Sequence, residues 1–322
     1  MGGILNRLSS LHQSSGSSVS SDARASLGRD LILTADDFNR IRALIYQHAG
    51  IVLAEHKQEM VYGRLAKRLR QLGIRHFGDY LSRLDGHPDN SEWEIFINAL
   101  TTNLTAFFRE SHHFPLLAKH ARQCQGRMRV WCAASSTGEE PYSIAMTLND
   151  ALGPSSLAQQ RFEVIATDID TEALAKARAG IYPWERLAQL DDDLVHRYFL
   201  RGKGSRQGQV RIHPDLASHL SFSSLNLLSS HWDLTGPFDA IFCRNVLIYF
   251  DEATQQRILG RFIPLLKPNG LLFLGHSEHI AAQSTVLLRC GQTVYGLPPG
   301  SKRKTHGLTT EVKKTSGSPK ES

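Results

Sequence analysis

A turn of small residues followed by two acids is the first stretch of this chain whose residue types suggest chemistry. CAASSTGEEPYS, residues 132–143, overlaps the apolar run RVWCAAS, residues 129–135, and precedes a helical pattern. Its small residues, including Gly138, let a ligand approach the backbone, and Glu139 and Glu140 follow directly. Open α/β sheets bind ligands at such turns, beyond the carboxyl ends of strands. The turn lacks G-x-G-x-x-G and a Walker lysine, and its carboxylates would repel phosphate, so a cationic ligand fits better.

A further acid lies where the next strand is expected to end. FEVIATDID, residues 162–170, predicts that strand, and Asp168 lies closest to its end. An acid at this position commonly hydrogen-bonds ribose hydroxyls. An adenosine ligand with a positive centre and no phosphate is S-adenosylmethionine. Taken alone, TDID is more often a helix cap and GEE a helix start, but their order at consecutive strand ends favours a site for this cofactor.

The elements around these turns alternate between strand and helix. Alternation of this kind implies parallel strands with right-handed crossovers, hence a doubly wound α/β sheet. Residues 181–222 break the rhythm, and the glycines and alternating polar residues of 201–212 predict a hairpin, so we expect a small antiparallel β insertion there. Strands are predicted at 129–135, 162–170, 238–246, 270–278 and 292–297, and helices at 138–152, 171–180 and 251–266.

A small helical domain is predicted before the sheet, over residues 31–100. Its first helix starts with the capping-box pair Thr34 and Asp37, and Gly50 suits its end. A second helix is expected within 57–73 and a third at 91–100. The second helix has apolar residues spaced to face inward and a basic side that could dock an acidic partner. The inward set is Val61, Leu65, Leu69 and Leu72, and the basic set is Arg64, Lys67, Arg68 and Arg70.

The composition is that of an ordinary globular protein. The 322 residues are 41% hydrophobic and 21% charged, with a formal net charge of +6. No apolar run has the ~20 residues of a membrane helix, and the N-terminus has no secretory-signal core. Four widely spaced cysteines match no zinc or disulfide pattern, which favours reduced thiols in the cytoplasm. Disorder is predicted for the Ser-rich residues 1–30 and the basic tail 299–322.

Six stretches of the chain together resemble a known family, the chemotaxis receptor methyltransferases of the CheR type. They are NLTAFFRE, AASSTGEEPYSIA, TDID, NLL, FDAIFCRNVLIYF and LLKPNGLLFLGHSE, in that order. The match runs from about residue 31 to 298. The resemblance implies methyl transfer from S-adenosylmethionine to glutamate side chains of chemoreceptors, with S-adenosylhomocysteine as product. It also implies a helical N-terminal domain and a Rossmann-like class I methyltransferase domain, here 101–298, with the β insertion.

The resemblance also assigns site residues, one position at a time. Arg109 and Tyr249 are expected to position the reacting groups, and Arg109 suits a carboxylate because a guanidinium binds it in a bidentate way. Arg109 could instead pair with Glu110, and Tyr249 could be a core aromatic. The expected cofactor-binding residues are Asn103, Thr105, Arg109, Glu140, Asp168, Asn226, Leu227, Arg244 and Asn245.

The segment NLTAFFRE, residues 103–110, could form a helix. In that case Leu104, Phe107 and Phe108 would share one face that anchors the segment against the sheet. Thr105 and Arg109 would share another face, toward the cofactor.

No general base is expected, because a glutamate with a pKa of ~4.3 is ionised at pH 7. No Ser-His-Asp, Cys-His or metal cluster stands out. His276 in GHSE could act as a base, but a structural role at the end of its strand is favoured. The expected partner is the helical, glutamate-bearing region of chemoreceptors, docked by Arg64, Lys67 and Arg68. The insertion could bind a receptor C-terminal peptide by strand addition.

The predicted protein is a cytoplasmic monomer, recruited to membrane receptor arrays, with no membrane insertion and no nucleic acid partner. Three alternatives stay open. A non-catalytic adaptor would bind S-adenosylmethionine without turnover. A nucleic-acid methyltransferase fits the pI near 9.2 but lacks the Asn/Asp-Pro-Pro-aromatic motif after the fourth strand. A nucleic-acid-binding module would use the basic helix and leave the cofactor turns unexplained.

Overall fold

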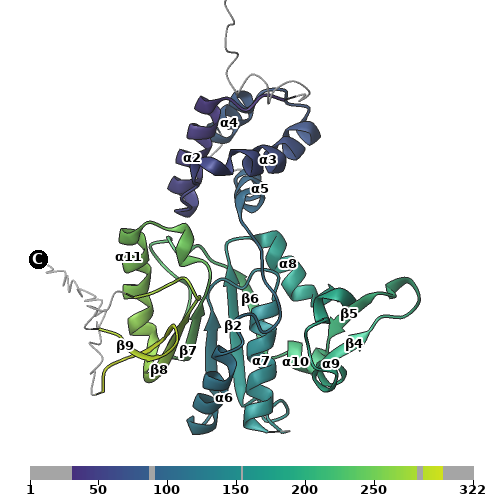
Figure 1. Cartoon of the computed structure of the whole chain (residues 1–322), viewed down its shortest axis with the longest axis vertical. Coiled ribbons are helices and arrows are strands. Elements are labelled where there is room, and N and C mark those ends of the chain that lie inside the picture. The colour runs from purple at the N-terminus through teal and green to yellow at the C-terminus, as the bar shows by residue number, and fades with distance from the viewer. Residues whose placement is uncertain (1–30, 87–90, 154, 281–285, 300–322) are drawn as a thin grey trace, which may run out of the picture.

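The computed structural model describes residues 31–86, 91–153, 155–280 and 286–299. Residues 1–30 and 300–322, where disorder is predicted, lie outside the described residues. A group of helices stands above a larger α/β part, and one linker after α5 joins them (Figure 1). Among the described residues no helix is long and apolar enough to span a bilayer.

Four α-helices build the described portion of the N-terminal part. α2 begins with the predicted capping box, in which the Thr34 side chain accepts from the Asp37 N–H and Asp37 bonds back to the Thr34 N–H. It ends at Gly50, whose φ of 69° favours glycine. The apolar stripes of the four helices pack together, so this part has a hydrophobic core of its own. The helices are α2 (Ala35–Ala49), α3 (Gln58–Leu72), α4 (Phe77–Asp85) and α5 (Ser91–Leu100).

The basic side of α3 is smaller than the sequence suggests. Arg68 forms an ion pair of 2.5 Å with the buried Glu92 of α5. Arg64 donates to the carbonyl oxygen of Thr101 at 2.5 Å, where α5 runs into the linker. Both side chains therefore hold this part of the protein together, whereas Lys67 is exposed. Two of the three residues predicted to dock an acidic partner, Arg64 and Arg68, are therefore already engaged within the protein.

The main sheet has seven strands in the order β6-β2-β1-β7-β8-β10-β9. The five strands from β6 to β8 are parallel, and β10 is antiparallel to both β8 and β9. The strand order reverses between β1 and β7, which is where open α/β sheets bind ligands. The strands are β1 (Met128–Cys132), β2 (Phe162–Asp168), β6 (Leu220–Ser224), β7 (Phe238–Cys243), β8 (Leu266–Leu274), β9 (Leu288–Gly291) and β10 (Val294–Gly296).

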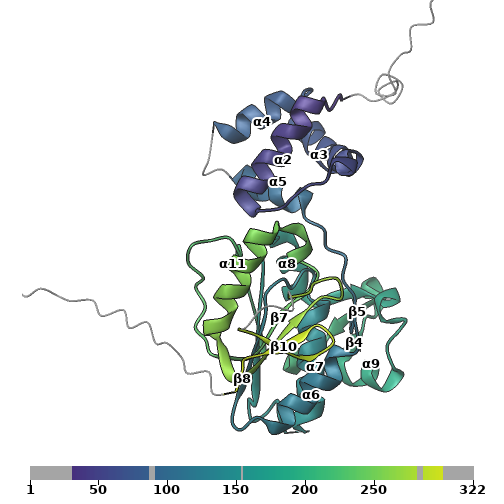
Figure 2. The ribbon, with the colours of Figure 1, turned by 60° about the vertical axis from the view of Figure 1, so that its left-hand side comes forward.

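Helices cover both faces of this sheet (Figure 2), as the doubly wound prediction requires. Alternate side chains of β1 show the two faces. Val130 and Cys132 pack with α6 and α7 in one core, whereas Trp131 packs with α11 in another. The helices are α6 (His113–Gln123), α7 (Glu139–Leu152), α8 (Thr171–Ala179) and α11 (Glu252–Phe262).

The β insertion is a three-stranded antiparallel sheet in the order β3-β5-β4. The predicted hairpin is β4 with β5. The predicted end of the insertion was wrong, because β6 begins at Leu220 and pairs with β2 in the main sheet. The elements are β3 (Ile181–Pro183), α9 (Asp192–Tyr198), β4 (Phe199–Arg201), β5 (Gln209–Ile212) and α10 (Pro214–Ala217).

Candidate functional site

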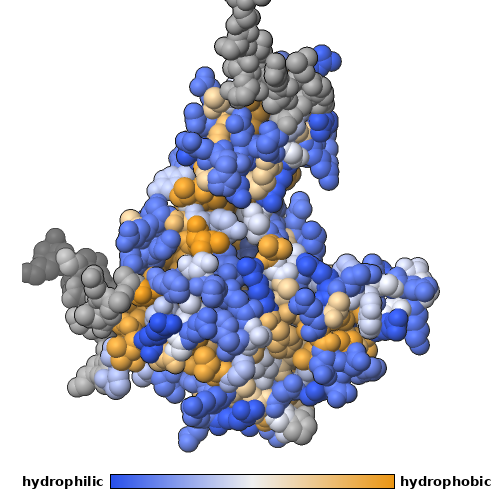
Figure 3. All heavy atoms as spheres, in the orientation of Figure 1, coloured by the Kyte–Doolittle hydropathy of each residue, from blue (hydrophilic) through white to orange (hydrophobic). Residues whose placement is uncertain are grey.

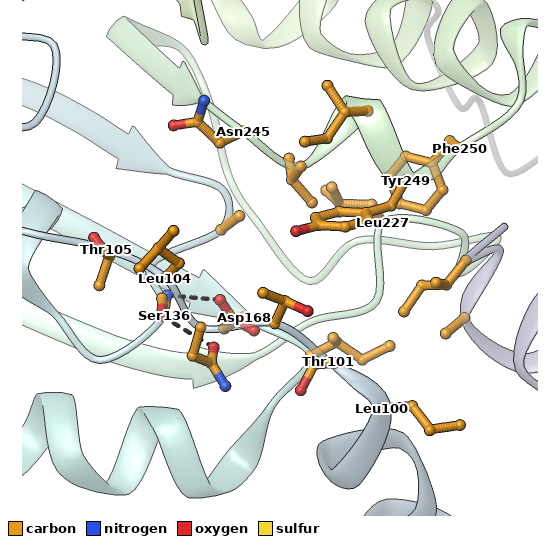
Figure 4. A pocket seen from close by; sticks show the side chains of 18 of the residues that line it. Leu100, Thr101, Leu104, Thr105, Ser136, Asp168, Leu227, Asn245, Tyr249 and Phe250 are labelled. Atoms are coloured by element: carbon orange, nitrogen blue, oxygen red, sulfur yellow. Dashed lines mark hydrogen bonds between the residues drawn. The ribbon is translucent and has the colours of Figure 1, made fainter. Parts of the chain in front are cut away.

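A cavity of about 360 Å³ lies between the helical part and the carboxyl ends of β1, β2 and β7. Residues of the loop after α2, of the linker after α5 and of the turns after these strands line it. All ten predicted site residues are among them, although they are spread over some 150 positions of the chain. The volume lies within the ~300–1,000 Å³ typical of small-molecule sites. Figure 4 shows this cavity from close by.

Asp168 lies at the end of β2 with its carboxylate held by two backbone N–H groups. Ser136 donates at 2.7 Å and Asp170 at 2.9 Å. Burial raises the pKa of Asp168 to about 6, and these two hydrogen bonds limit the rise. The side chain keeps acceptor capacity toward the cavity (Figure 4). Its setting suits an acceptor of ribose hydroxyls.

Asn103 connects the linker to the turns after β1 and β2. Its amide nitrogen donates to Asp170 at 2.7 Å, and its amide oxygen accepts from the Ser136 hydroxyl at 3.0 Å. Thr101 reaches the same carboxylate of Asp170 at 2.6 Å. The linker is thereby fixed beside Asp168, although it lies more than 60 residues away in the chain.

NLTAFFRE is not helical, so the helical interpretation was wrong. Phe108 and Glu110 have φ values of 53° and 54°, which no right-handed helix contains. Phe107 is buried and packs edge-on against Phe199 of the insertion, whereas Leu104 is exposed at the cavity. The adjacent phenylalanines therefore tie the segment to the insertion and to α6, and the polar residues remain beside the cavity.

Arg109 keeps most of its hydrogen-bonding capacity. It donates to the carbonyl oxygen of Leu104 at 2.6 Å, and its other donors have no partner among the residues that the structure describes. The alternative pairing with Glu110 does not form. Glu110 instead meets Arg244 at 3.2 Å and the Asn245 amide at 3.1 Å. Arg109 is thus a cation at the cavity wall that remains able to bind a carboxylate.

Arg244 and Glu140 form a buried ion pair of 2.5 Å at the cavity wall. Arg244 also donates to the backbone oxygen of Arg109 at 2.5 Å. This bond fixes the backbone from which the Arg109 side chain extends. Burial raises the pKa of Glu140, and the charge of Arg244 opposes the rise. Glu140 is therefore largely neutralised by a partner within the protein, a contact that the motif GEEPYS does not reveal.

Asn226 and Leu227 lie together at the far wall. The Asn226 amide donates to the His48 carbonyl oxygen of α2 at 2.8 Å and accepts from Leu228 N–H at 2.9 Å. These contacts use one of the two donors and one of the two acceptor sites of the amide, so Asn226 keeps hydrogen-bonding capacity at the cavity that it lines. Leu227 is buried and forms apolar wall. The residue at position 226 thus joins the two parts of the protein.

Tyr249 points its ring into the cavity beside Leu227, and its hydroxyl is directed toward the side where Leu104 and Asp168 lie (Figure 4). That hydroxyl has no hydrogen-bond partner among the described side chains. The backbone oxygen of Tyr249 accepts from Val52 N–H at 2.8 Å, another contact between the two parts. The core alternative for Tyr249 does not hold, because the side chain is partly exposed to the cavity.

Glu278 is a residue that the sequence did not single out. Its buried carboxylate accepts from the N–H groups of Asn245, Val246, Leu247, Ile248 and Gly275, at 2.6 to 3.4 Å. It thereby shapes the turn that carries Asn245, whose φ is 56°, and leads to Tyr249. The GHSE motif was the available signal. His276 of the same motif is exposed and lies outside the cavity lining.

The chain matches two family models in chain order. Residues 36–101 match the CheR methyltransferase all-alpha domain and residues 103–295 the CheR methyltransferase SAM binding domain. The chain is 59% identical to a chemotaxis protein methyltransferase of Klebsiella aerogenes, over 86% of this chain and 95% of that one. It is 58% identical to one of Escherichia coli, over 83% and 92%.

A solved glycopeptide N-methyltransferase complexed with sinefungin is a far more distant neighbour. It has 15% identity and a TM-score of 0.32 over 54% of this chain and 52% of its own, too little to add to the assignment. The assignment rests on the two domain matches and the high identity over nearly the whole length of the relatives. This chain therefore belongs to the CheR methyltransferase family, and its α/β part is an S-adenosylmethionine-binding methyltransferase domain.

Proposed function

We propose that this protein methylates glutamate side-chain carboxylates of membrane-bound chemoreceptors, giving glutamate methyl esters and S-adenosylhomocysteine for sensory adaptation. One observation carries the proposal. The same cavity contains Asp168 at a strand end, as a nucleoside site requires, and Arg109 with uncommitted donors for a carboxylate. The relatives' name, chemotaxis protein methyltransferase, supports a chemoreceptor as the acceptor.

The residues at the cavity fit S-adenosylmethionine. Asp168 can accept from ribose hydroxyls, and the small side chains of Ala133 and Ala134 let a ligand approach the turn after β1. Leu227 provides an apolar surface for an adenine ring. After its two contacts within the protein, the Asn226 amide keeps one donor and one acceptor site for an adenine edge. When bound, the cofactor supplies a methyl group on a positively charged sulfur.

The transfer needs no proton acceptor. A carboxylate oxygen of the acceptor glutamate forms a bond to the methyl carbon while the carbon–sulfur bond breaks and its electron pair stays on sulfur. At pH 7 a glutamate with a pKa of ~4.3 is already ionised. The exposed His276 is therefore not required as a base.

Arg109 and Tyr249 are assigned to positioning. Holding two reactants in line can lower a barrier by ~7–11 kcal/mol. The charges of carboxylate and sulfonium disappear as they react, so too strong a grip on the carboxylate would stabilise the ground state and slow transfer. Arg109 and Tyr249 suit this task because both side chains line the cavity and remain partly exposed. Each can therefore orient the carboxylate without gripping it as tightly as a fully buried partner would.

The proposed partner is the helical, glutamate-bearing cytoplasmic region of chemoreceptors. Of the three α3 residues expected to dock, Lys67 is the exposed one, whereas Arg64 and Arg68 are bound internally. The free edges of the insertion, β3 and β4, are where a receptor C-terminal peptide would add a strand. The proposal implies a cytoplasmic monomer that is recruited to receptor arrays.

The test is transfer of labelled methyl from S-adenosylmethionine to receptor-containing membranes, scored as base-labile methyl ester. Label that disappears when the receptor glutamates are replaced by alanine is the expected result. Absence of label, with S-adenosylhomocysteine still bound in calorimetry, would favour the adaptor or another acceptor. Nucleic acid would then be the next acceptor tried, with steep loss of oligonucleotide binding in salt as its signature.

A further inference from the structure

Three apolar side chains remain exposed around the opening of the cavity. Leu104 is 75% exposed, Ile248 50% and Val52 48%, and each of them lines the cavity. They come from the linker after α5, the turn after β7 and the loop after α2, so no single local sequence explains them. Figure 3 shows apolar side chains at the surface where the helical part meets the α/β part. We call Val52, Leu104 and Ile248 the apolar rim.

The apolar rim borders the opening on more than one side. The hydrogen bond from Val52 N–H to the Tyr249 oxygen places Val52 next to the turn that contains Ile248. Leu104 lies across the cavity from Tyr249 (Figure 4). A group that passes through the opening therefore passes between apolar side chains. Apolar surface that gathers at one opening, rather than being scattered singly, marks an interaction site.

The small cofactor does not account for the rim. The apolar wall that a nucleoside needs is already present in Leu227 and Phe250, which are both buried and line the cavity. The rim side chains instead remain 48% to 75% exposed. Their position suits a macromolecule that covers the opening while one of its side chains enters.

We propose that the apolar rim docks the apolar flank of the receptor helix that presents the acceptor glutamate. On a helix, residues three and four positions from the glutamate lie beside it at ~5–6 Å, so they would meet the rim while the carboxylate enters. The exposed Lys57 and the half-buried Arg109 line the same cavity and complement the acidic acceptor. The rim thus favours glutamates with apolar neighbours over those on a fully charged face. This inference rests on the proposed function.

The experiment replaces the rim residues by serine, singly and together, as Val52→Ser, Leu104→Ser and Ile248→Ser. The matched control is Ile32→Ser, which removes a side chain that is 61% exposed and lies outside the cavity lining. Two quantities are measured: the KM for receptor-containing membranes and the Kd for S-adenosylhomocysteine by calorimetry. Thermal melting of each variant checks the fold.

For each rim substitution the membrane KM rises about threefold to tenfold, as expected for apolar area left unburied. The triple variant shows a larger rise, while its Kd for S-adenosylhomocysteine stays within twofold of the unaltered protein. Ile32→Ser changes neither quantity. A second set of variants places serine in the receptor at the apolar positions beside the acceptor glutamate. These receptor changes should raise the KM of the unaltered enzyme more than that of the triple variant, because the triple variant already lacks the contact.

Two results would overturn the inference while leaving the proposed function intact. One is an unchanged membrane KM in the folded triple variant. The other is a Kd for S-adenosylhomocysteine that weakens by the same factor as methylation, which would make the rim a cover for the cofactor. Failure of the proposed function gives a different result, because the unaltered protein would then form no methyl ester. The rim inference would fail in that case as well.

Discussion

The carboxylate of Glu278, beyond the end of β8, accepts the backbone N–H of Leu247 at 2.7 Å, in the turn that follows β7. Neighbouring N–H groups share the same carboxylate, which is an economical way to hold a turn with a positive φ. The turn leads to Tyr249, so Glu278 acts on the cavity without lining it.

Glu278→Gln tests this relationship. A glutamine offers one oxygen in place of two, so at least two buried N–H groups lose their partner at about 1–3 kcal/mol each. We expect kcat to fall roughly ten- to a hundredfold through misplacement of Tyr249, with a smaller change in the Kd for S-adenosylhomocysteine. Kinetics and calorimetry measure both. The control is Glu172→Gln on the exposed side of α8, and an unchanged kcat in the folded Glu278→Gln variant would remove the assigned role.

Asp168 gives the cavity a pH dependence. Burial raises its pKa to about 6, so it loses its charge as pH falls through that value. The ionised form is the better acceptor for ribose hydroxyls. We therefore expect S-adenosylhomocysteine affinity to be level above pH 7 and to fall about tenfold per unit well below pH 6. Calorimetry from pH 5 to 8 measures it. Asp168→Asn should bind weakly without this step, and an identical step in that variant would point to another group.

Arg109 and Tyr249 should separate kinetically. Arg109→Ala should raise the membrane KM and lower kcat/KM at least tenfold, because a charge-assisted contact is lost. Arg109→Lys should recover part of the lost kcat/KM, since the positive charge remains although the bidentate geometry does not. Tyr249→Phe should lower kcat with little change in the Kd for S-adenosylhomocysteine. Steady-state methylation measures these values, with the exposed Arg122→Ala as control. Unaltered turnover in both variants would disprove the positioning roles.

The basic residues of α3 should divide into two groups. Arg68→Ala leaves Glu92 buried without its counter-ion, so the free energy of unfolding should fall by about 3 kcal/mol. Lys67→Ala should change stability by less than about 0.5 kcal/mol but weaken receptor methylation at low salt. Denaturant unfolding and methylation at several salt concentrations measure the two effects. Equal stability of both variants would mean that the Arg68–Glu92 pair is not structural.

The elements that sequence could predict are those set by local signals. Thr34, Asp37 and Gly50 delimit α2 through capping chemistry. β1 ends in the buried apolar run 130–132 and β7 in the buried apolar run 240–243. The cavity residues could be placed together because strand ends of a doubly wound sheet meet at one edge.

The elements that sequence did not predict depend on distant partners. β6, LSFSS, has no fully buried residue and becomes a strand by pairing with β2, more than 50 positions earlier. β9 is an exposed edge strand. α4 and α6 were also missed, and in α6 two buried histidines face acceptors far along the chain, at Gln292 and Asp239.

The roles of single site residues were harder to predict than their location. Nothing local to Asn226 indicates that its amide bonds α2, or that Glu110 bonds Arg244 rather than Arg109. The helical interpretation of NLTAFFRE failed for the same reason. Its positive φ values are maintained by contacts with the insertion and with α7, not by its own sequence.

The contact of Asn226 with His48 constrains how this architecture can be recombined. One residue both lines the cavity and bonds the end of α2, and Gly50 packs so closely that an added Cβ would lie 2.4 Å from Leu228. A helical domain exchanged for that of a relative must therefore bring a matching end of α2 and a residue without a side chain after it. The outer surfaces of the two domains can vary independently, but the end of α2 and the segment 226–228 that it contacts must be exchanged together.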